Sequence, residues 1–209
     1  EVPSRGLGDV YKRQRKLLEC VSPNNFSNSA HPFGTWKNIE IGSGLARAHR
    51  VSYVGELGWE IYISSDQCAH VFEEIWKFQQ EMKFNLCGIH ALDSCRIEKA
   101  YRHFGHDITD EDHIVDAGLC FTADLSKKNF EGKESILNKR KIGSSKKMLQ
   151  FKLNDPSKMI YHNEPVLRDN KIVGYLTSGN FGHTLGGCIG LGYVAVSYTH
   201  LTLPTKQMV

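Results

Sequence analysis

The sequence predicts an α+β fold, in which a mixed helix-and-strand unit precedes a small all-β unit. The first part combines an alternating strand pattern at 58–63 with a helical pattern at 66–82. After Gly143-Ser144-Ser145 the helical spacing stops, and short strand-like runs separated by turn residues continue to residue 196. This change of pattern predicts a domain boundary near residue 143.

Two strands are expected at the beginning of the mixed unit, after an irregular polar segment at 15–40. The first covers 45–54, and the second covers 58–63. In the second, the apolar residues occupy alternate positions from Trp59 onward, so Glu60 takes the opposite face.

Helices and loops are expected next. Ser64-Ser65-Asp66 offers an N-cap for a helix over 66–82, and Gly88 separates it from a second helix over 89–100. The apolar residues of this second helix do not follow one narrow stripe, so we expect burial on more than one side. The sequence further predicts a loop at 101–115, a strand at 119–125 and a short helix at 130–140.

The all-β unit is expected to contain four short strands and one tight hairpin. Asp169-Asn170 is the hairpin signal, because both residue types tolerate a left-handed backbone. The four strands are expected at 148–153, 164–167, 171–177 and 188–196.

The two ends do not resemble the middle of the chain. Residues 1–14 and 197–209 show no helical or strand period, and both resemble translated adaptor sequence. We therefore expect 1–14 and 197–209 to be non-native tails, 15–143 to be the first domain and 144–196 the second. The alternative is that both ends are ordinary disordered tails.

Charge and composition exclude several classes of protein. The chain of 209 residues has a formal net charge of +3, and each excluded end contributes +1, which leaves +1 for 15–196. Such a balance is not typical of a nucleic-acid-binding protein. No apolar run is long enough for a membrane span. The six cysteines form no CxxC pair, and most lie in apolar sequence, which indicates buried thiols in a reducing compartment.

Several polar clusters are candidate functional sites. The glycine-rich stretch 186–192 enters a strand and not a helix, so a tight turn is favoured over a nucleotide site. The histidines and aspartate of His103-Phe104-Gly105-His106-Asp107 could ligate a metal. Their spacing matches no known metal site, and structural roles are favoured. Asp93 and Arg96, at positions i and i+3 of a helix, are expected to form a surface ion pair.

One motif carries a family resemblance. The stretch 53–61, YVGELGWEI, resembles the YxGExGxE motif of the glycine-cleavage T-protein superfamily. The stretches 91–99 and 101–108, ALDSCRIEK and YRHFGHDI, look like the version found in dimethylglycine and sarcosine dehydrogenases. Three shorter matches follow in the same order at 116–119, 177–179 and 182–185. The resemblance covers about 35–196.

The resemblance implies part of a folate-binding aminomethyltransferase-like module, followed by a C-terminal all-β barrel-like domain. It also implies that Tyr53, Glu60, Arg96 and Tyr101 bind tetrahydrofolate. In that family the glutamate matching Glu60 grips the pterin ring, and the tyrosine matching Tyr53 lies against it. A carboxylate can accept two adjacent N–H groups of a pterin at once, and a tyrosine ring supplies a flat apolar wall. No metal is implied.

Two departures from the family pattern indicate which branch is present. The T-protein has a folate-binding arginine at the position of Leu92, and its absence favours the dehydrogenase branch. The aspartate that the family places near the reacting folate nitrogen is missing, so the catalytic residues are expected upstream of this chain. A flavin-binding segment for FAD is also expected upstream.

The resemblance therefore implies the tetrahydrofolate-binding part of a flavin-dependent dimethylglycine or sarcosine dehydrogenase, with an N-methylated glycine as substrate. We expect no activity from the chain alone, and neither a nucleic-acid nor a membrane partner. The compartment would be the cytoplasm in a bacterium or the mitochondrial matrix in a eukaryote. Two alternatives are a free-standing aminomethyltransferase and a non-catalytic folate-binding regulatory subunit. The oligomeric state is not predicted.

Overall fold

The computed structural model describes residues 7–198, and the side chains of residues 13–197. The chain divides into two compact units, Glu1–Leu92 and Asp93–Val209. Each unit is described by itself. The division lies well before residue 143, within helix α4 (Ile89–Glu98). The domain boundary expected near residue 143 therefore stays a prediction.

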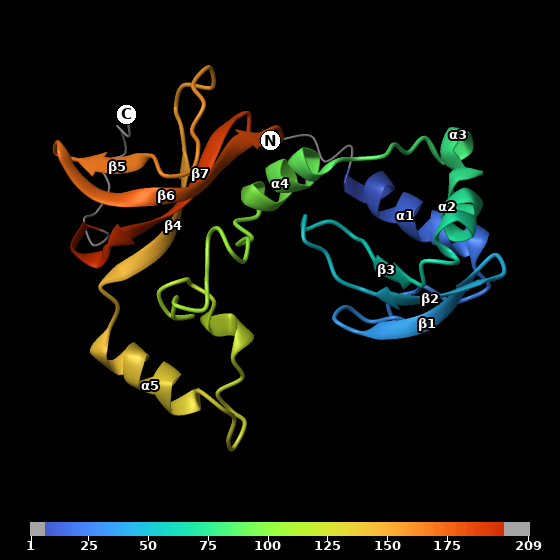
Figure 1. Ribbon diagram of the computed structural model, residues 1–209, viewed down its shortest axis with the longest axis horizontal. Coiled ribbons are helices and arrows are strands. Elements are labelled where there is room, and N and C mark those ends of the chain that lie inside the picture. The colour runs from blue at the N-terminus through green and yellow to red at the C-terminus, as the bar shows by residue number, and fades with distance from the viewer. Residues whose placement is uncertain (1–6, 199–209) are drawn as a thin grey trace. The chain divides into compact units, whose positions relative to one another are not determined.

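In its described residues, 7–92, the first unit contains a three-stranded antiparallel sheet, three complete helices and the beginning of α4. The sheet has the order β1-β2-β3 (Figure 1). Its strands are β1 (Trp36–Ile41), β2 (Gly44–His49) and β3 (Glu60–Ile63). The helices are α1 (Leu7–Val21), α2 (Cys68–Trp76) and α3 (Gln79–Met82).

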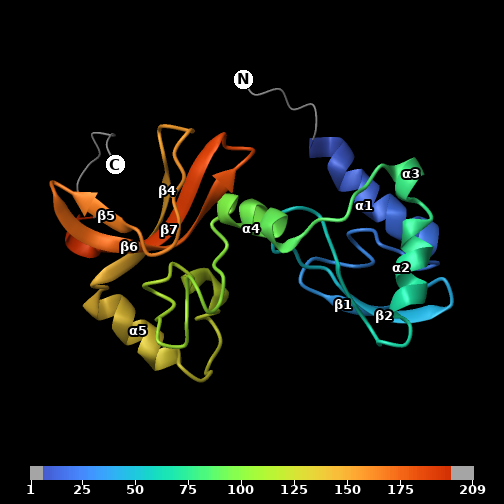
Figure 2. The ribbon, with the colours of Figure 1, turned by 45° about the horizontal axis from the view of Figure 1, so that its top comes forward.

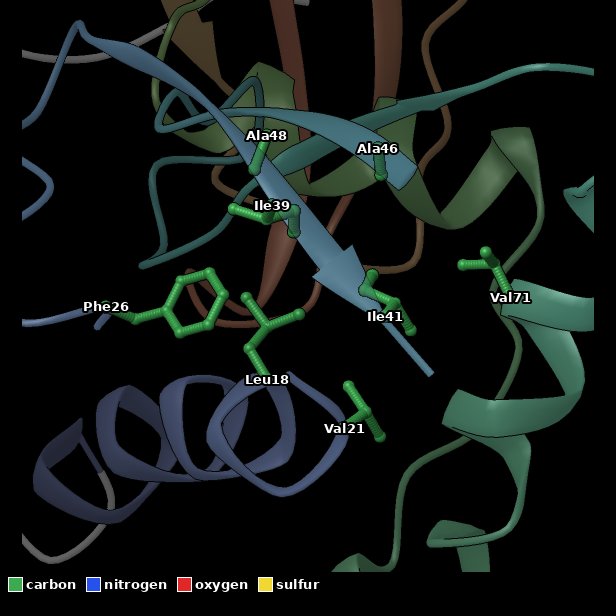
Figure 3. Packing of buried hydrophobic residues seen from close by; sticks show 8 residues of the cluster. All are labelled: Leu18, Val21, Phe26, Ile39, Ile41, Ala46, Ala48 and Val71. Carbon is green, nitrogen blue, oxygen red and sulfur yellow. The ribbon is translucent and has the colours of Figure 1, made fainter. Parts of the chain in front are cut away.

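One face of this sheet is buried against helices. Figure 3 shows Leu18 and Val21 of α1 below the strand β1, with Val71 of α2 beside it. Along β2 the buried and exposed residues alternate strictly from Gly44 to Ala48, as a strand with one covered face requires. The remaining buried members of this core are Phe26, Ile39, Ile41, Ala46 and Ala48.

The helices of this unit differ from the predicted ones in three respects. Helix α1 begins at Leu7, so residues 7–14 are helical although their sequence shows no helical period. Extending an existing helix adds one hydrogen bond per residue, and this needs no apolar period of its own. The helix predicted at 66–82 is interrupted at Lys77 and Phe78. It begins only at Cys68, and Gln67 at its N-cap makes no side-chain capping bond.

The second unit contains a four-stranded antiparallel sheet in the order β4-β7-β6-β5 (Figure 2). Its strands are β4 (Lys146–Lys152), β5 (Pro165–Arg168), β6 (Lys171–Gly182) and β7 (Gly187–Ala195). Helix α5 (Lys133–Ile142) and the short 3-10 helices η1 (Cys120–Thr122) and η2 (Val196–Tyr198) complete the described part. The hairpin predicted at Asp169-Asn170 is confirmed, because these residues have φ angles of 49° and 58°.

One prediction in this unit is wrong, and one is confirmed in a different form. Residues 119–125 form no strand, since the positive φ of Gly118 turns the chain into η1 and leaves Phe121 81% exposed. Helix α4 buries Ser94, Arg96 and Ile97. Ser94 and Arg96 lie about 160° apart around the helix, so burial on more than one side is confirmed, although the covered residues are largely polar.

The cysteines also differ from expectation. Cys20, Cys68, Cys87 and Cys95 are exposed, whereas Cys188 is buried in the core of the second unit. Apolar neighbours in sequence did not indicate burial here, because a helix such as α2 places adjacent residues on different faces.

Strand β7 lies between two neighbouring strands, and Gly192 allows β6 to approach it closely. A Cβ atom at Gly192 would overlap the carbonyl oxygen of Tyr175, which is backbone and cannot move aside. We expect Gly192→Ala to lower the free energy of unfolding by about 1–3 kcal/mol. Urea unfolding measures this change. Gly88→Ala is the control, because a Cβ there meets nothing within 4 Å. Equal effects of both substitutions would contradict the prediction.

Candidate folate-binding site

The outer face of the β1-β2-β3 sheet carries a group of aromatic and charged side chains. Register places His49 of β2 opposite Glu60 of β3 and opposite Trp36 of β1. Two residues further along β2, Arg47 lies opposite Tyr62. Because alternate residues of a strand point to the same face, these side chains share the face that the helices leave uncovered.

Glu60 is the first residue of β3, and its side chain is exposed. Its Oε2 atom accepts a hydrogen bond of 2.8 Å from the hydroxyl of Tyr62. This hydrogen bond and the negative charge of Glu60 raise the pKa of Tyr62. Within the described residues Oε1 accepts no hydrogen bond, so Glu60 can receive an N–H donor from a ligand. The predicted orientation is confirmed, since Trp59 and Ile61 pack toward the core.

Tyr53 lies half-buried in the turn that leads into β3. Two features shape this turn: the hydroxyl of Ser52 accepts a 3.0 Å hydrogen bond from the Glu56 backbone, and Gly55 has a φ of 72°. A positive φ is strained for most side chains, which explains the glycine. Tyr53 and Glu60 thus belong to one continuous segment of the first unit.

A buried polar group holds the beginning of this segment. The Arg50 guanidinium donates to the carbonyl of His31 at 2.6 Å and to Asn28 at 2.8 Å. The indole of Trp59 donates to Nδ1 of His31 at 3.3 Å. Burial of His31 lowers the pKa of its imidazole, which favours the neutral form that can accept this bond. The two ends of the turn are therefore tied to the same histidine.

Arg96 lies in the second unit and is almost completely buried, with 2% of its surface exposed. Its Nε donates to Asp93 at 2.6 Å, and its Nη1 donates to Asp107 at 2.5 Å. Nη1 also donates to the backbone carbonyl of Tyr101 at 3.0 Å. The expected ion pair between Asp93 and Arg96 is confirmed, but its placement on the surface is wrong for Arg96, because the loop after α4 covers the arginine.

Asp107 is the centre of this buried network. Besides Arg96, it accepts hydrogen bonds from the backbone N–H of His103 and from the hydroxyls of Thr177 and Ser178. Burial alone would raise the pKa of Asp107, but these donors and the charge of Arg96 hold it below its ordinary value. The carboxylate therefore joins α4, the following loop and β6.

The four predicted folate-binding residues thus have different environments. Glu60 is exposed and Tyr53 half-buried in the first unit. Tyr101 of the second unit is 38% exposed, and its carbonyl accepts from Arg96. The guanidinium of Arg96 is committed to Asp93, Asp107 and that carbonyl. Folate binding by these residues stays a prediction, and the geometry of Arg96 favours a structural role.

Sequence reasoning missed the neighbours of Glu60 on the outer face. Trp36, Arg47 and His49 were not predicted as site residues. The sequence does contain a pattern that indicates this face, since β2 alternates small residues with larger ones from Gly44 to His49. That alternation indicates an outer face, but the pairing of β2 with β3 was needed to place it beside Glu60.

The remaining polar clusters lie in the second unit. Residues 7–198 contain no group of three or more His, Cys, Asp or Glu side chains that could hold a metal ion. His103 and His106 have ring centroids 4.6 Å apart, whereas Asp107 faces the interior. The glycine-rich stretch enters β7, as expected. None of the described helices has the length and apolar character needed to cross a membrane.

Comparison with known families decides the relationship of the chain. Residues 13–127 match the family model described as the GCVT N-terminal domain, and residues 146–205 match the glycine cleavage T-protein C-terminal barrel domain. The chain belongs to the glycine cleavage T-protein family. The resemblance seen in the sequence is confirmed, and so is the fold: a GCVT-like α+β module followed by a C-terminal antiparallel β domain.

The similar proteins comprise both oxidising enzymes and aminomethyltransferases. The chain is 38% identical to 4-methylaminobutanoate oxidase (formaldehyde-forming) of Paenarthrobacter nicotinovorans, over 88% of the chain and 23% of that protein. It is 34% identical to human mitochondrial sarcosine dehydrogenase, over 86% of the chain and 20% of that enzyme. It is also 33% identical to the aminomethyltransferase of Halothermothrix orenii, over 86% of the chain and 50% of that protein.

A solved structure supports the same relationship. The glycine cleavage system aminomethyltransferase T of Bartonella henselae superposes with a TM-score of 0.66 and 25% sequence identity, over 73% of this chain and 42% of that one. The chain thus spans between a fifth and a half of the length of these relatives.

Proposed function

We propose that the chain is the tetrahydrofolate-binding part of a flavin-dependent enzyme of the dimethylglycine and sarcosine dehydrogenase type. This enzyme would oxidise an N-methylated glycine and pass the released one-carbon unit to tetrahydrofolate. Flavin, bound elsewhere in the longer protein, would supply the oxidation. The chain would hold the folate beside the oxidised product, so that transfer occurs by proximity.

The exposed carboxylate of Glu60 carries this proposal. It lies at the beginning of β3 with one oxygen bonded to Tyr62. A pterin presents a ring N–H and an amino group side by side, and a carboxylate can accept hydrogen bonds from both. Tyr53 at the other end of the same turn supplies an aromatic wall. The residues present therefore fit a reduced folate.

The dehydrogenase branch is favoured over a free-standing aminomethyltransferase by one residue and two relatives. Leu92 cannot donate the hydrogen bonds of the arginine that T-proteins have at this position. Two of the relatives named above are an oxidase and a sarcosine dehydrogenase. The aminomethyltransferase remains the second candidate, supported by the superposition on the Bartonella enzyme. We propose the mitochondrial matrix as compartment in a eukaryote and the cytoplasm in a bacterium.

The chain alone is expected to be colourless and inactive toward dimethylglycine and sarcosine. The full reading frame that contains it should be yellow and should oxidise one of them. With tetrahydrofolate added, that protein should release less formaldehyde and form methylene-tetrahydrofolate. Flavin absorbance, formaldehyde release and folate products are the measurements. A flavin spectrum in the chain alone, or formaldehyde release that ignores folate, would contradict the proposal. An inert, colourless full-length protein that still binds folate would favour the regulatory alternative.

A further inference from the structure

Two arginines of the first unit donate hydrogen bonds to the same amide oxygen. Arg15, in α1, donates from Nη2 to Oδ1 of Asn28 at 2.7 Å. Arg50, directly after β2, donates from its own Nη2 to the same Oδ1 atom at 2.8 Å. An uncharged amide oxygen therefore brings two positive charges close together.

The packing of the first unit fixes this arrangement. Leu18, three residues after Arg15 on α1, and Phe26, two residues before Asn28, belong to the same buried core (Figure 3). Arg50 is itself only 9% exposed. Because its side chain is enclosed, it cannot turn into solvent without loosening the core around it. The two guanidiniums are therefore held together by the fold.

Neither guanidinium has a negatively charged partner among the described side chains, those of residues 13–197. No ion pair in this part of the chain includes Arg15 or Arg50. Glu19, one turn after Arg15 on α1, is exposed. Burial, followed by the neighbouring charge of Arg15, lowers the pKa of Arg50. A buried charge without a partner is costly, so this pair favours the binding of an anion.

The same edge of both guanidiniums carries unused donors. The Nε atoms of Arg15 and Arg50 are buried and have no hydrogen-bond partner. Nη2, beside Nε, carries two hydrogens, and the bond to Asn28 needs one of them. Nε and Nη2 together form a fork that can hold an oxyanion through two parallel hydrogen bonds. Asn28 is exposed and Arg15 half-buried, so the pair lies next to solvent.

We propose that Arg15 and Arg50 bind a phosphate dianion, either free phosphate or the phosphate group of a larger molecule. Each guanidinium would donate from Nε and Nη2 to phosphate oxygens. A phosphate group carries roughly −1.5 to −2 charges at pH 7 and has three acceptor oxygens, so it can neutralise both arginines. A carboxylate offers a single charge and two oxygens. This site is separate from the proposed folate function, and either can fail without the other.

Calorimetric titration of the 209-residue chain with inorganic phosphate, at constant ionic strength, tests the site. The wild-type chain should bind phosphate saturably. Arg15→Gln should bind it about tenfold to a hundredfold more weakly, because hydrogen bonds to a charged group are lost. Lys16→Gln is the matched control, since it removes the same charge from the next position of α1, which is exposed. Its phosphate affinity should equal that of the wild type.

Methyl phosphate distinguishes the two sources of the ligand. If it binds as tightly as inorganic phosphate, the site accepts the phosphate group of a larger molecule. If only inorganic phosphate binds, the site holds the free ion.

Asn28→Asp tests the site without removing an arginine. It places a carboxylate at the shared acceptor with almost the same shape. The melting temperature in phosphate-free buffer should rise, because the carboxylate neutralises the two arginines from within the chain. Phosphate should raise the melting temperature of the wild type by binding the folded state, and most of this rise should be lost in Asn28→Asp. This variant decides the question even if Arg15→Gln does not fold.

Three results would overturn the inference. The first is no saturable phosphate binding by the wild-type chain. The second is an equal loss of affinity in Arg15→Gln and Lys16→Gln, which would mean general electrostatic attraction. The third is an undiminished phosphate response in Asn28→Asp. Acetate that binds as tightly as phosphate would overturn the choice of phosphate, and would assign the two arginines to a carboxylate ligand.

Discussion

Replacing Asp107 with alanine is expected to lower the free energy of unfolding by about 3–5 kcal/mol, because it leaves the guanidinium of Arg96 buried without its main counter-charge. Asp107 accepts hydrogen bonds from Arg96, Thr177, Ser178 and the backbone of His103. Its removal would also leave these donors without their acceptor. Urea unfolding of the 209-residue chain at neutral pH measures the change.

Asp110→Ala is the control for this substitution, since Asp110 lies exposed in the same loop. Its effect should be within about 0.5 kcal/mol. A double-mutant cycle with Arg96→Met isolates the pair, and the two losses should be strongly non-additive. Additive losses, or a cost below about 1 kcal/mol for Asp107→Ala, would show that the network contributes little to stability.

The same carboxylate predicts a pH dependence. The pKa of Asp107 in the fold lies below its ordinary value of 3.8. A group with a depressed folded pKa stabilises the fold at pH values above the unfolded pKa, and this contribution is lost as the pH falls toward the folded value. The stability difference between the wild-type chain and Asp107→Asn should therefore shrink below about pH 4. A constant difference down to pH 2 would contradict the depressed pKa.

Glu60→Gln is expected to weaken tetrahydrofolate binding by about tenfold to a thousandfold, since each hydrogen bond to a charged group contributes roughly 1.5–3 kcal/mol and one or two would be lost. Glutamine keeps the shape of the side chain but replaces one acceptor oxygen with a donor. The side chain is exposed, so the fold should be unaffected. Calorimetric titration with reduced folate in the full-length protein measures the loss.

Tyr62→Phe is the companion variant, because it removes only the hydroxyl that bonds to Glu60. It should weaken binding less than Glu60→Gln, since the carboxylate keeps its charge and loses only one partner that orients it. Affinity that stays unchanged in Glu60→Gln, with the melting temperature preserved, would make Glu60 an ordinary outer-face residue of a strand.

Local patterns predicted the parts of the fold that depend on local geometry. Strand alternation oriented Trp59 and Glu60 correctly, because successive side chains of a strand point to opposite faces whatever lies around them. The turn at Asp169-Asn170 was predictable for a similar reason, since few residue types tolerate two consecutive left-handed conformations. The YxGExGxE motif can likewise be recognised from a short stretch of sequence, and the family match confirms that it belongs to the T-protein family.

Elements that depend on distant partners were not predictable in this way. The apolar run at 119–125 had strand composition, but no neighbouring strand pairs with it in the described chain, and it became a 3-10 turn. Helix α1 extends back to Leu7 although its apolar contacts with the core come from Leu18 and Val21 at its other end. In the first case the strand lacks a partner, and in the second the helix propagates from its packed end, so local preference decided neither element.

Arg96 shows most clearly what local sequence could not predict. Its spacing from Asp93 is that of an ion pair on a helix surface, and this spacing is the same whether the helix face is exposed or covered. Its burial depends on Asp107, eleven positions away, and on the hydroxyls of β6, about seventy positions from Asp107. The sequence by itself determined the family, the strand faces and the position of Glu60. The tertiary structure decided which charges became interior, because burial is a property of what folds over a residue and not of its neighbours in sequence.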